Sequence, residues 1–163
     1  MKISDMKKIM PDIFEDIKKL VYKTINRKRA GLMLGLAELG VYNGLYIGAY
    51  HILASNYIIL NKTPLYLLEE KSDDLIYAYI YHLLLHEYLH TLGIVDERLC
   101  IELTYEISKR EFGDDHLITI LAKGGMKKVF PEIIYAPINF KMSSDQKIEL
   151  VRDFDRSSAC YFS

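Results

Sequence analysis

The sequence has few cysteines and no excess of charge of either sign. Its two cysteines, Cys100 and Cys160, are too few for a disulfide framework and suit a reducing compartment. Its 21 basic and 22 acidic residues leave a net charge of -1, which provides no field to attract nucleic acid or an anionic membrane. Composition therefore disfavours a secreted disulfide scaffold and a nucleic-acid-binding protein.

The chain also lacks long apolar runs. The N-terminal stretch MKISDMKKIMPDIFEDIKKL mixes charged and apolar residues, so it has no apolar core of a secretory signal. The most apolar region, 30–60, carries Glu38, Asn43 and His51 together with several glycines, which is typical of strands and turns. We therefore expect a cytoplasmic protein without a membrane partner.

The size of the chain favours one domain. At 163 residues and 50% hydrophobic composition, it is long enough to bury a full core by itself. No repeat or low-complexity linker divides it. We predict a single domain over 1–163, with 130–163 as a C-terminal extension that packs on it.

The spacing of apolar residues predicts an α+β fold. Pro11 suits the first turn of a helix that runs to about Asn26, and glycine-broken Tyr, Ile and Leu segments then predict strands near 32–37, 45–54 and 57–60. The run KSDDLIYAYIYHLLLHEYLHTLG predicts a long buried helix that begins after Ser72 or Asp73 and stops at Gly93. The prediction is a small mixed sheet of three or four strands packed on this long helix.

The sequence after Gly93 predicts fewer regular elements. A third helix fits 96–112, with Asp96 as its N-cap and Gly113 at its end. The stretch ITILAKGGMKKVFPEIIYAPINF favours irregular or extended structure, and 144–154 fits a last helix.

The long helix carries the strongest chemical signal, HEYLH. On a helix, His86 and His90 lie only about 40° apart in angle, with Glu87 close to both. Two imidazoles on consecutive turns can share one zinc ion, which lowers the pKa of its water so that the glutamate can act as general base. The pattern predicts one zinc per chain, with Glu87 as the catalytic residue.

The motif extends beyond its second histidine. Gly93 follows three residues after His90 and can turn the chain back, which brings Asp96 toward the metal as the first choice of third ligand. A shuffled sequence of this composition would contain the whole extended pattern about once in ten thousand times. A competing interpretation makes Asp96 only a helix N-cap.

The stretch HEYLHTLGIVDE resembles the zincin metallopeptidases. His86, Glu87, His90, Gly93 and Asp96 match the H-E-x-x-H-x-x-G-x-x-D form of the metzincin signature. The segment from YIILNKTPLYLL through the long helix to KREFGDDH also resembles small, largely uncharacterised archaeal zincin-like proteins. The resemblance implies a zincin-like fold, zinc on His86, His90 and Asp96, and Glu87 as general base.

Two further features follow from the resemblance. Metzincins place a methionine beneath the metal, and the candidates here are Met126 and Met142. The strand NYIILN resembles the zincin edge strand that holds an extended peptide, which would make 57–60 the floor of a cleft.

The third ligand has alternatives. The gluzincin branch takes a glutamate from the following helix, for which Glu102 and Glu106 are the candidates. Glu97 remains a further alternative because it adjoins Asp96. Among the other histidines, His82 lies one turn before His86 and is expected to be a buried, hydrogen-bonded helix residue.

The sequence thus predicts a zinc metallopeptidase acting on a peptide or protein substrate. The first alternative is an inactive or autoinhibited zincin-fold protein that binds metal or peptide, with its cleft covered by 130–163. A weaker alternative is a metal-dependent ribonuclease, which the near-neutral charge disfavours.

Overall fold

A computed structural model gives the structure of the chain and describes residues 1–137 and 140–156. The helical elements are α1 (Ile3–Ile25), α2 (Lys62–Leu68), α3 (Asp73–Thr91), α4 (Glu97–Phe112), α5 (Leu117–Ile120), the π-helical turn η1 (Leu121–Gly125) and α6 (Met126–Val129). The strands are β1 (Met33–Ala37), β2 (Val41–Tyr42), β3 (Leu45–Ile47), β4 (Ala49–His51), β5 (Tyr57–Asn61), β6 (Ile133–Ile134) and β7 (Glu149–Leu150). The α+β class predicted from the sequence is confirmed.

The strands form two small sheets. The larger has the order β4-β5-β1-β7, in which β1 and β5 run parallel while β4 and β7 run antiparallel to their neighbours. The smaller has the order β2-β3-β6, with β6 parallel to β3. The larger sheet is therefore mixed, and β4 and β7 are its edges.

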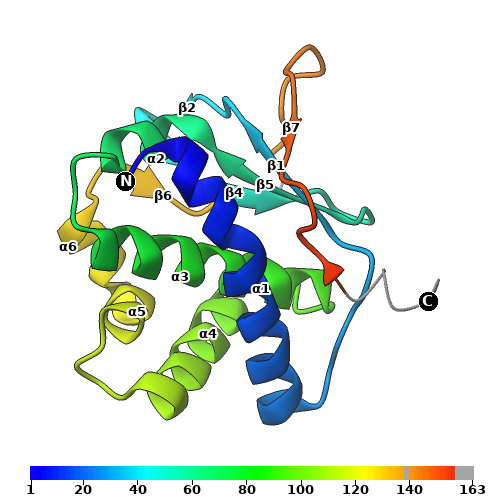
Figure 1. Ribbon diagram of the computed structural model, residues 1–163, viewed down its shortest axis with the longest axis vertical. Helices are drawn as coiled ribbons and strands as arrows, with labels where there is room; N and C mark the ends of the chain where they lie inside the picture. The colour runs from blue at the N-terminus through cyan, green and yellow to red at the C-terminus, as the bar shows by residue number, and fades with distance from the viewer. Residues whose placement is uncertain (138–139, 157–163) are drawn as a thin grey trace.

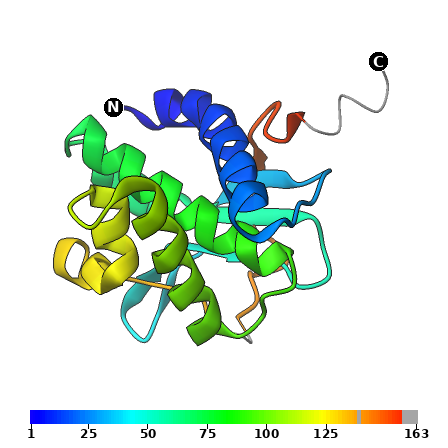
Figure 2. The ribbon, with the colours of Figure 1, turned by 90° about the horizontal axis from the view of Figure 1, so that it is seen from below.

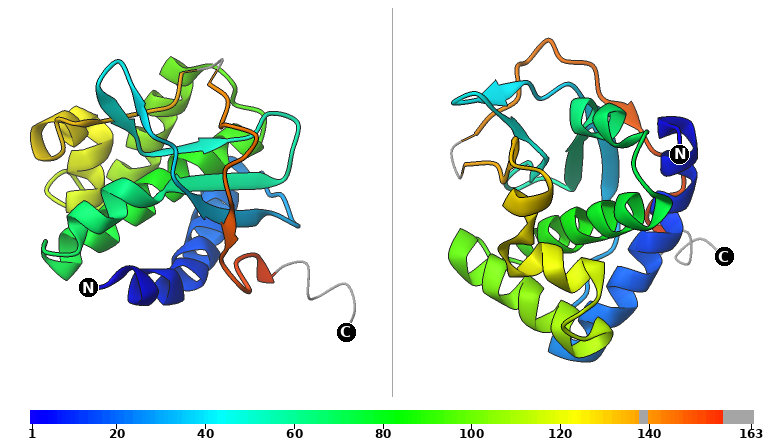
Figure 3. Two further views of the ribbon diagram at one scale, coloured as in Figure 1. Left: turned by 90° about the horizontal axis from the view of Figure 1, so that it is seen from above. Right: turned by 90° about the vertical axis from the view of Figure 1, so that its left-hand side faces the viewer.

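The long helix α3 lies between the strands and the other helices. Figure 1 shows the strands on one side of α3 and helices α4 and α5 on the other, with α1 crossing it. Figure 2, from below, and the right-hand view in Figure 3 show the same arrangement. Tyr79, Leu84 and Tyr88 of α3 are fully buried, and burying one large apolar side chain contributes about 1.5–3 kcal/mol.

The ends of α3 follow from its sequence, and the prediction for this helix is confirmed. The Ser72 side chain caps the helix by accepting a hydrogen bond from the Leu75 N–H, and Asp73 and Asp74 place negative charge at its positive end. The chain leaves the helix at Gly93, whose φ of 97° lies in the left-handed region that favours glycine.

Two other predictions along the chain are wrong in part. Helix α1 begins at Ile3, because Met6 and Met10 continue its buried stripe, so Pro11 lies inside the helix and not in its first turn. The stretch predicted as irregular or extended after α4 is irregular or extended only beyond 129, where it holds β6, and is helical over 117–129, with a kink at Gly124. Ile118, Leu121 and Met126 are buried there, and packing in the main core stabilises these short turns.

The predicted last helix over 144–154 is also wrong. This region holds β7, which pairs with β1, and Val151 and Phe154 beyond it enter the main core. Between β6 and β7 the chain crosses over the strands (Figure 3, left). Its apolar residues, among them Phe140, Met142 and Ile148, pack with Tyr50 and Ile59 in a second cluster. The described C-terminal residues thus pack against the sheet.

The predicted edge strand is misplaced. Strand β5 lies between β4 and β1, so residues 57–60 form an interior strand, and β4 is the edge next to α3. The Gly48 carbonyl accepts from the Asn61 N–H and the Ile52 N–H donates to the Tyr57 carbonyl. Since backbone groups alternate in direction along an antiparallel strand, those of Ala49 and His51 point away from the sheet.

Candidate metal centre

Helix α3 places His86 and His90 on consecutive turns of one face. Their ring centroids are 4.8 Å apart and the rings are nearly perpendicular, at 82°. His86 is fully buried, whereas His90 is partly exposed at the end of the helix. The two imidazoles therefore approach a common space near the C-terminus of α3.

Glu97 closes that space from the first turn of α4. Its Oε1 atom lies 2.7 Å from His86 Nε2, and its Oε2 atom lies 3.0 Å from His90 Nε2. The turn at Gly93 and the N-cap at Asp96 bring the first residue of α4 back over the end of α3. One carboxylate thus contacts the Nε2 atoms of both histidines.

The other candidate third ligands lie elsewhere. The Asp96 carboxylate accepts a hydrogen bond from the Leu99 N–H at 2.8 Å and caps α4. Glu102 pairs with Arg98 on an exposed face of α4, and Glu106 is exposed. The structure thus brings together His86, Glu87, His90 and Glu97, and not the first choice Asp96.

Cys100 is a site residue that the sequence reasoning missed. Its Sγ atom lies 3.8 Å from His86 Nδ1, and its S–H donates to the His86 carbonyl at 3.3 Å. Among the described residues, His86, His90 and Cys100 form a group whose ligand atoms lie within 4.8 Å of one another and could hold a metal ion. Its spacing in the sequence could have indicated this role. Cys100 follows Glu97 by three residues, which puts both side chains on one side of α4.

Two buried atoms of this site lack hydrogen-bond partners. His86 Nε2 and Glu97 Oε1 approach each other closely but without the alignment of a hydrogen bond. Leaving a buried polar atom unpaired costs about 1–3 kcal/mol, and an ion between the two groups would satisfy both. Imidazole and carboxylate are also ligands that zinc accepts. The residues present therefore fit a bound metal ion.

Each histidine is oriented through its other ring nitrogen. His90 Nδ1 lies 2.7 Å from the Ile94 carbonyl and donates to it, and His86 Nδ1 faces Cys100. A partner at one nitrogen directs the other toward the ligand position. This arrangement leaves both Nε2 atoms directed at Glu97.

Glu97 and the two histidines shift one another's pKa values. Burial lowers the pKa of His86, but Cys100 and Glu97 outweigh it and raise the pKa to about 9. The same opposing causes raise the pKa of His90 to about 11. Burial works against the Glu97 carboxylate, yet the two histidines hold its pKa at about 2. Each histidine and Glu97 thus favour the charged form of the other.

Glu87 is buried beside the two histidines. Only 2% of it is exposed, and this burial raises its pKa above the usual range. His86, His90 and the backbone N–H of His51 act in the opposite direction. A carboxyl group held in this way can keep a proton closer to neutral pH than an exposed glutamate can.

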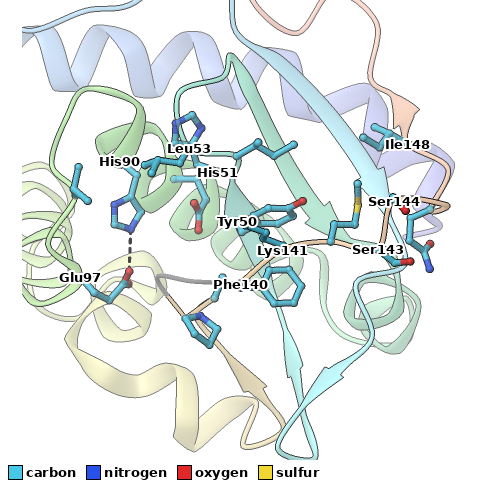
Figure 4. A pocket seen from close by; sticks show the side chains of 17 residues that line it. Tyr50, His51, Leu53, His90, Glu97, Phe140, Lys141, Ser143, Ser144 and Ile148 are labelled. Atoms are coloured by element: carbon cyan, nitrogen blue, oxygen red, sulfur yellow. Dashed lines mark hydrogen bonds and ion pairs between the residues drawn. The ribbon is translucent and has the colours of Figure 1, made fainter.

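The site opens into a cavity of about 530 Å³. Glu87, His90 and Glu97 lie at one end, and residues 50–53, which include part of edge strand β4, form one wall. Figure 4 shows His90 facing Glu97, with Tyr50 and Phe140 farther along. Phe140 packs edge-on against Tyr50 at 5.1 Å, and it lines the cavity together with Ala136, Pro137 and residues 141–144 of the segment after β6.

The two methionine candidates suggested by the resemblance lie in different parts of the fold. Met126 is buried in the main core, and Met142 lines the cavity wall. The residue stacked on His86 is Tyr135, at a centroid distance of 4.3 Å and an angle of 11°. His82 is buried and hydrogen-bonded through Nε2 to the Tyr135 hydroxyl, as expected for a buried helix histidine.

No protein family, curated protein or solved structure matches this chain. Among the described residues, no helix combines the length and the apolar character that a membrane crossing requires. The geometry of the candidate metal centre therefore carries the functional proposal.

Proposed function

We propose that the protein is a zinc-dependent metallopeptidase of zincin-like fold. The observation that carries the proposal is the approach of two histidine Nε2 atoms to one carboxylate, 2.7 and 3.0 Å away, beside a buried glutamate at the end of a cavity. A structural pair of histidines in a core helix would not need a carboxylate and a cavity at the same point.

The proposed ligands are His86, His90 and Glu97. Glu97 takes the role first expected for Asp96, since Asp96 uses its carboxylate to cap α4. Cys100 and the Ile94 carbonyl orient the two imidazoles. A zinc ion held there would supply a Lewis acid and an acidified water molecule.

Glu87 is the proposed general base. Its carboxylate takes a proton from the attacking water and later delivers it to the leaving amine. Burial raises the pKa of Glu87, which favours its holding that proton between the two steps. The outward-facing backbone groups of Ala49 and the His51 carbonyl on β4 offer hydrogen bonds to an extended peptide substrate, whereas the His51 N–H is directed at Glu87.

Substitution of the proposed base tests the function. We expect Glu87→Gln to keep its zinc and to lose at least about 100-fold in the rate of peptide hydrolysis, because the amide cannot accept the proton. Glu102→Gln, at an exposed position of α4, is the matched control and should leave the rate unchanged. Hydrolysis of a mixed peptide library, followed by mass spectrometry, measures both. A Glu87→Gln protein as active as the wild type would contradict the proposal.

The autoinhibited or binding-only alternative has its own supporting observation. Residues between β6 and β7 form one wall of the cavity, and Phe140 packs directly on Tyr50 of β4. A truncation near 139 is a poor test, because it removes β7 together with the core residues Val151 and Phe154.

Point substitutions in the wall test this alternative better. If the wall limits access, Phe140→Ala combined with Met142→Ala should raise peptide hydrolysis over that of the wild type. Val129→Ala, at an exposed position on α6 outside the cavity, is the control. If the double variant and the wild type both bind zinc and neither hydrolyses any peptide, the protein is a binding protein.

A further inference from the structure

The flat face of His86 is covered by an aromatic ring. The Tyr135 ring stacks on it with a centroid distance of 4.3 Å and an interplanar angle of 11°. Tyr135 comes from the segment directly after β6, 49 residues along the chain from His86. This contact limits rotation of the imidazole about its own axis, because a tilted ring would collide with the tyrosine.

Tyr135 is itself held from two sides. Ile134 before it pairs with Ile47, and the Gly48 N–H donates to the Ile134 carbonyl at 3.0 Å. On the other side, the Tyr135 hydroxyl bonds to His82 Nε2 at 2.6 Å. His82 is 1% exposed, so this hydrogen bond is protected from water.

Gly48 lets this part of the chain approach α3. A Cβ atom at this position would come within 3.2 Å of the side chains of Ile133 and Leu83. The absence of a side chain therefore allows β6 to lie close to the helix that carries the histidines. Ile133 lies two residues before Tyr135, so this close packing contributes to the placement of Tyr135.

Tyr135 and Cys100 act on different parts of the same imidazole. The tyrosine covers its face, and Cys100 contacts its Nδ1 edge at 3.8 Å. Together they leave Nε2 directed at Glu97, 2.7 Å away. Neither group has to move for His86 to bind a metal ion through Nε2.

We propose that Tyr135 is a positioning residue that fixes the direction of His86 Nε2 toward the metal, with His82 as the anchor of its hydroxyl. The inference rests on the metal site proposed above. Under this proposal His82, one turn before the metal-binding motif, affects the metal site only through its hydrogen bond to Tyr135. Pre-oriented ligands bind more tightly because less freedom is lost on binding.

Three variants separate the parts of this arrangement. Tyr135→Leu removes the flat face, whereas Tyr135→Phe and His82→Phe keep the rings and remove the hydrogen bond. We expect Tyr135→Leu to weaken zinc binding about 10- to 100-fold and the other two to weaken it less. The double variant of Tyr135→Phe and His82→Phe should be no worse than either single variant, because both remove one interaction.

Tyr79→Phe is the matched control. Tyr79 is a fully buried tyrosine of α3 whose hydroxyl lacks a partner and whose ring packs on Phe130. Zinc affinity, measured by competition with a chelating dye, should be unchanged in this variant. The visible spectrum of the cobalt-loaded protein reports ligand geometry, and we expect it to change in Tyr135→Leu and not in Tyr79→Phe. Unchanged zinc affinity and an unchanged cobalt spectrum in Tyr135→Leu would overturn the proposal.

Nuclear magnetic resonance distinguishes this failure from failure of the metal site. If the wild type bound neither zinc nor cobalt, the metal-site proposal would fail, and the imidazole signals of the metal-free protein would still test the role of Tyr135. We expect one sharp set of His86 ring signals in the wild type and broadened or doubled signals in Tyr135→Leu, in addition to the shift that loss of the tyrosine ring current causes by itself. His86 signals that remain single and as sharp as in the wild type would show that Tyr135 does not position the ring.

Discussion

At the scale of single residues, neighbouring acids at the start of α4 have separate tasks. Asp96 caps the helix, and Glu97, one position later, faces the histidines. A difference of one residue changes the direction of a side chain by about 100° at the start of a helix, so sequence spacing alone could not choose between them. The motif residues His86, Glu87 and His90 could be placed because a regular helix fixes their relative angles.

Substitution of each acid separates the two tasks. We expect Glu97→Ala to lower zinc affinity by at least about 100-fold, because a ligand is lost. Asp96→Ala should keep its zinc and lower the free energy of unfolding by about 1 kcal/mol through loss of the cap. Zinc titration and urea denaturation measure the two effects. Zinc lost in Asp96→Ala and retained in Glu97→Ala would contradict this assignment and would make Asp96 the metal ligand.

At the scale of elements, segments with strong local signals were predicted better than segments whose structure depends on a distant partner. Helices α3 and α4 have side-chain caps and glycine stops within the sequence, so their bounds were predictable. Strand β7 pairs with β1, more than a hundred residues away, and nothing local in 144–154 indicates that partner. The same holds for β6 and therefore for Tyr135, whose place beside His86 depends on pairing with β3.

The turn between α3 and α4 provides a prediction at this scale. Gly93 has a φ of 97°, and a Cβ atom there would meet no other atom within 4 Å. Gly93→Ala should therefore cost about 1 kcal/mol in backbone strain alone. Because this turn carries Ile94 and leads to Glu97, we also expect about tenfold weaker zinc binding.

Gly113→Ala is the control for the turn. Gly113 has a φ of 83° and equally open surroundings, but it ends α4 away from the metal centre. Its ψ of 171° places it in a region that only glycine adopts readily, so Gly113→Ala should lose at least as much stability and still keep the zinc affinity of the wild type. Equal zinc affinity in both variants would show that the turn at Gly93 does not position the ligands.

At the scale of the whole molecule, Glu149 connects the C-terminal segment to two helices. Its carboxylate pairs with Lys7 of α1 and lies 2.8 Å from Lys62 of α2. Hydrogen bonds from Lys62 and Lys7 lower the pKa of Glu149 to about 2. A carboxylate with a lowered pKa stabilises the folded state above its unfolded pKa of 4.5, and this contribution is lost as the pH falls from 4.5 toward 2.

Glu149→Gln tests this connection. The side chain is 41% exposed, so solvent screening limits the expected loss at pH 7 to about 1 kcal/mol or less. The difference from the wild type should shrink as the pH is lowered through the range from 4.5 to 2. Glu70→Gln, at an exposed position, should match the wild type throughout. Urea denaturation at several pH values measures these differences, and one that stayed constant with pH would contradict the assignment.

The central claim is that His86, His90 and Glu97 hold a metal ion in the folded chain. Metal content per chain, measured by elemental analysis after extensive dialysis of wild-type and His86→Ala proteins, tests it most directly. We predict about one zinc ion per wild-type chain, because two imidazoles and one carboxylate converge on one point. We predict none in the variant, because it lacks one of the two imidazoles. No metal in the wild type, even after zinc is added, would contradict the claim and leave HEYLH as part of a buried helix.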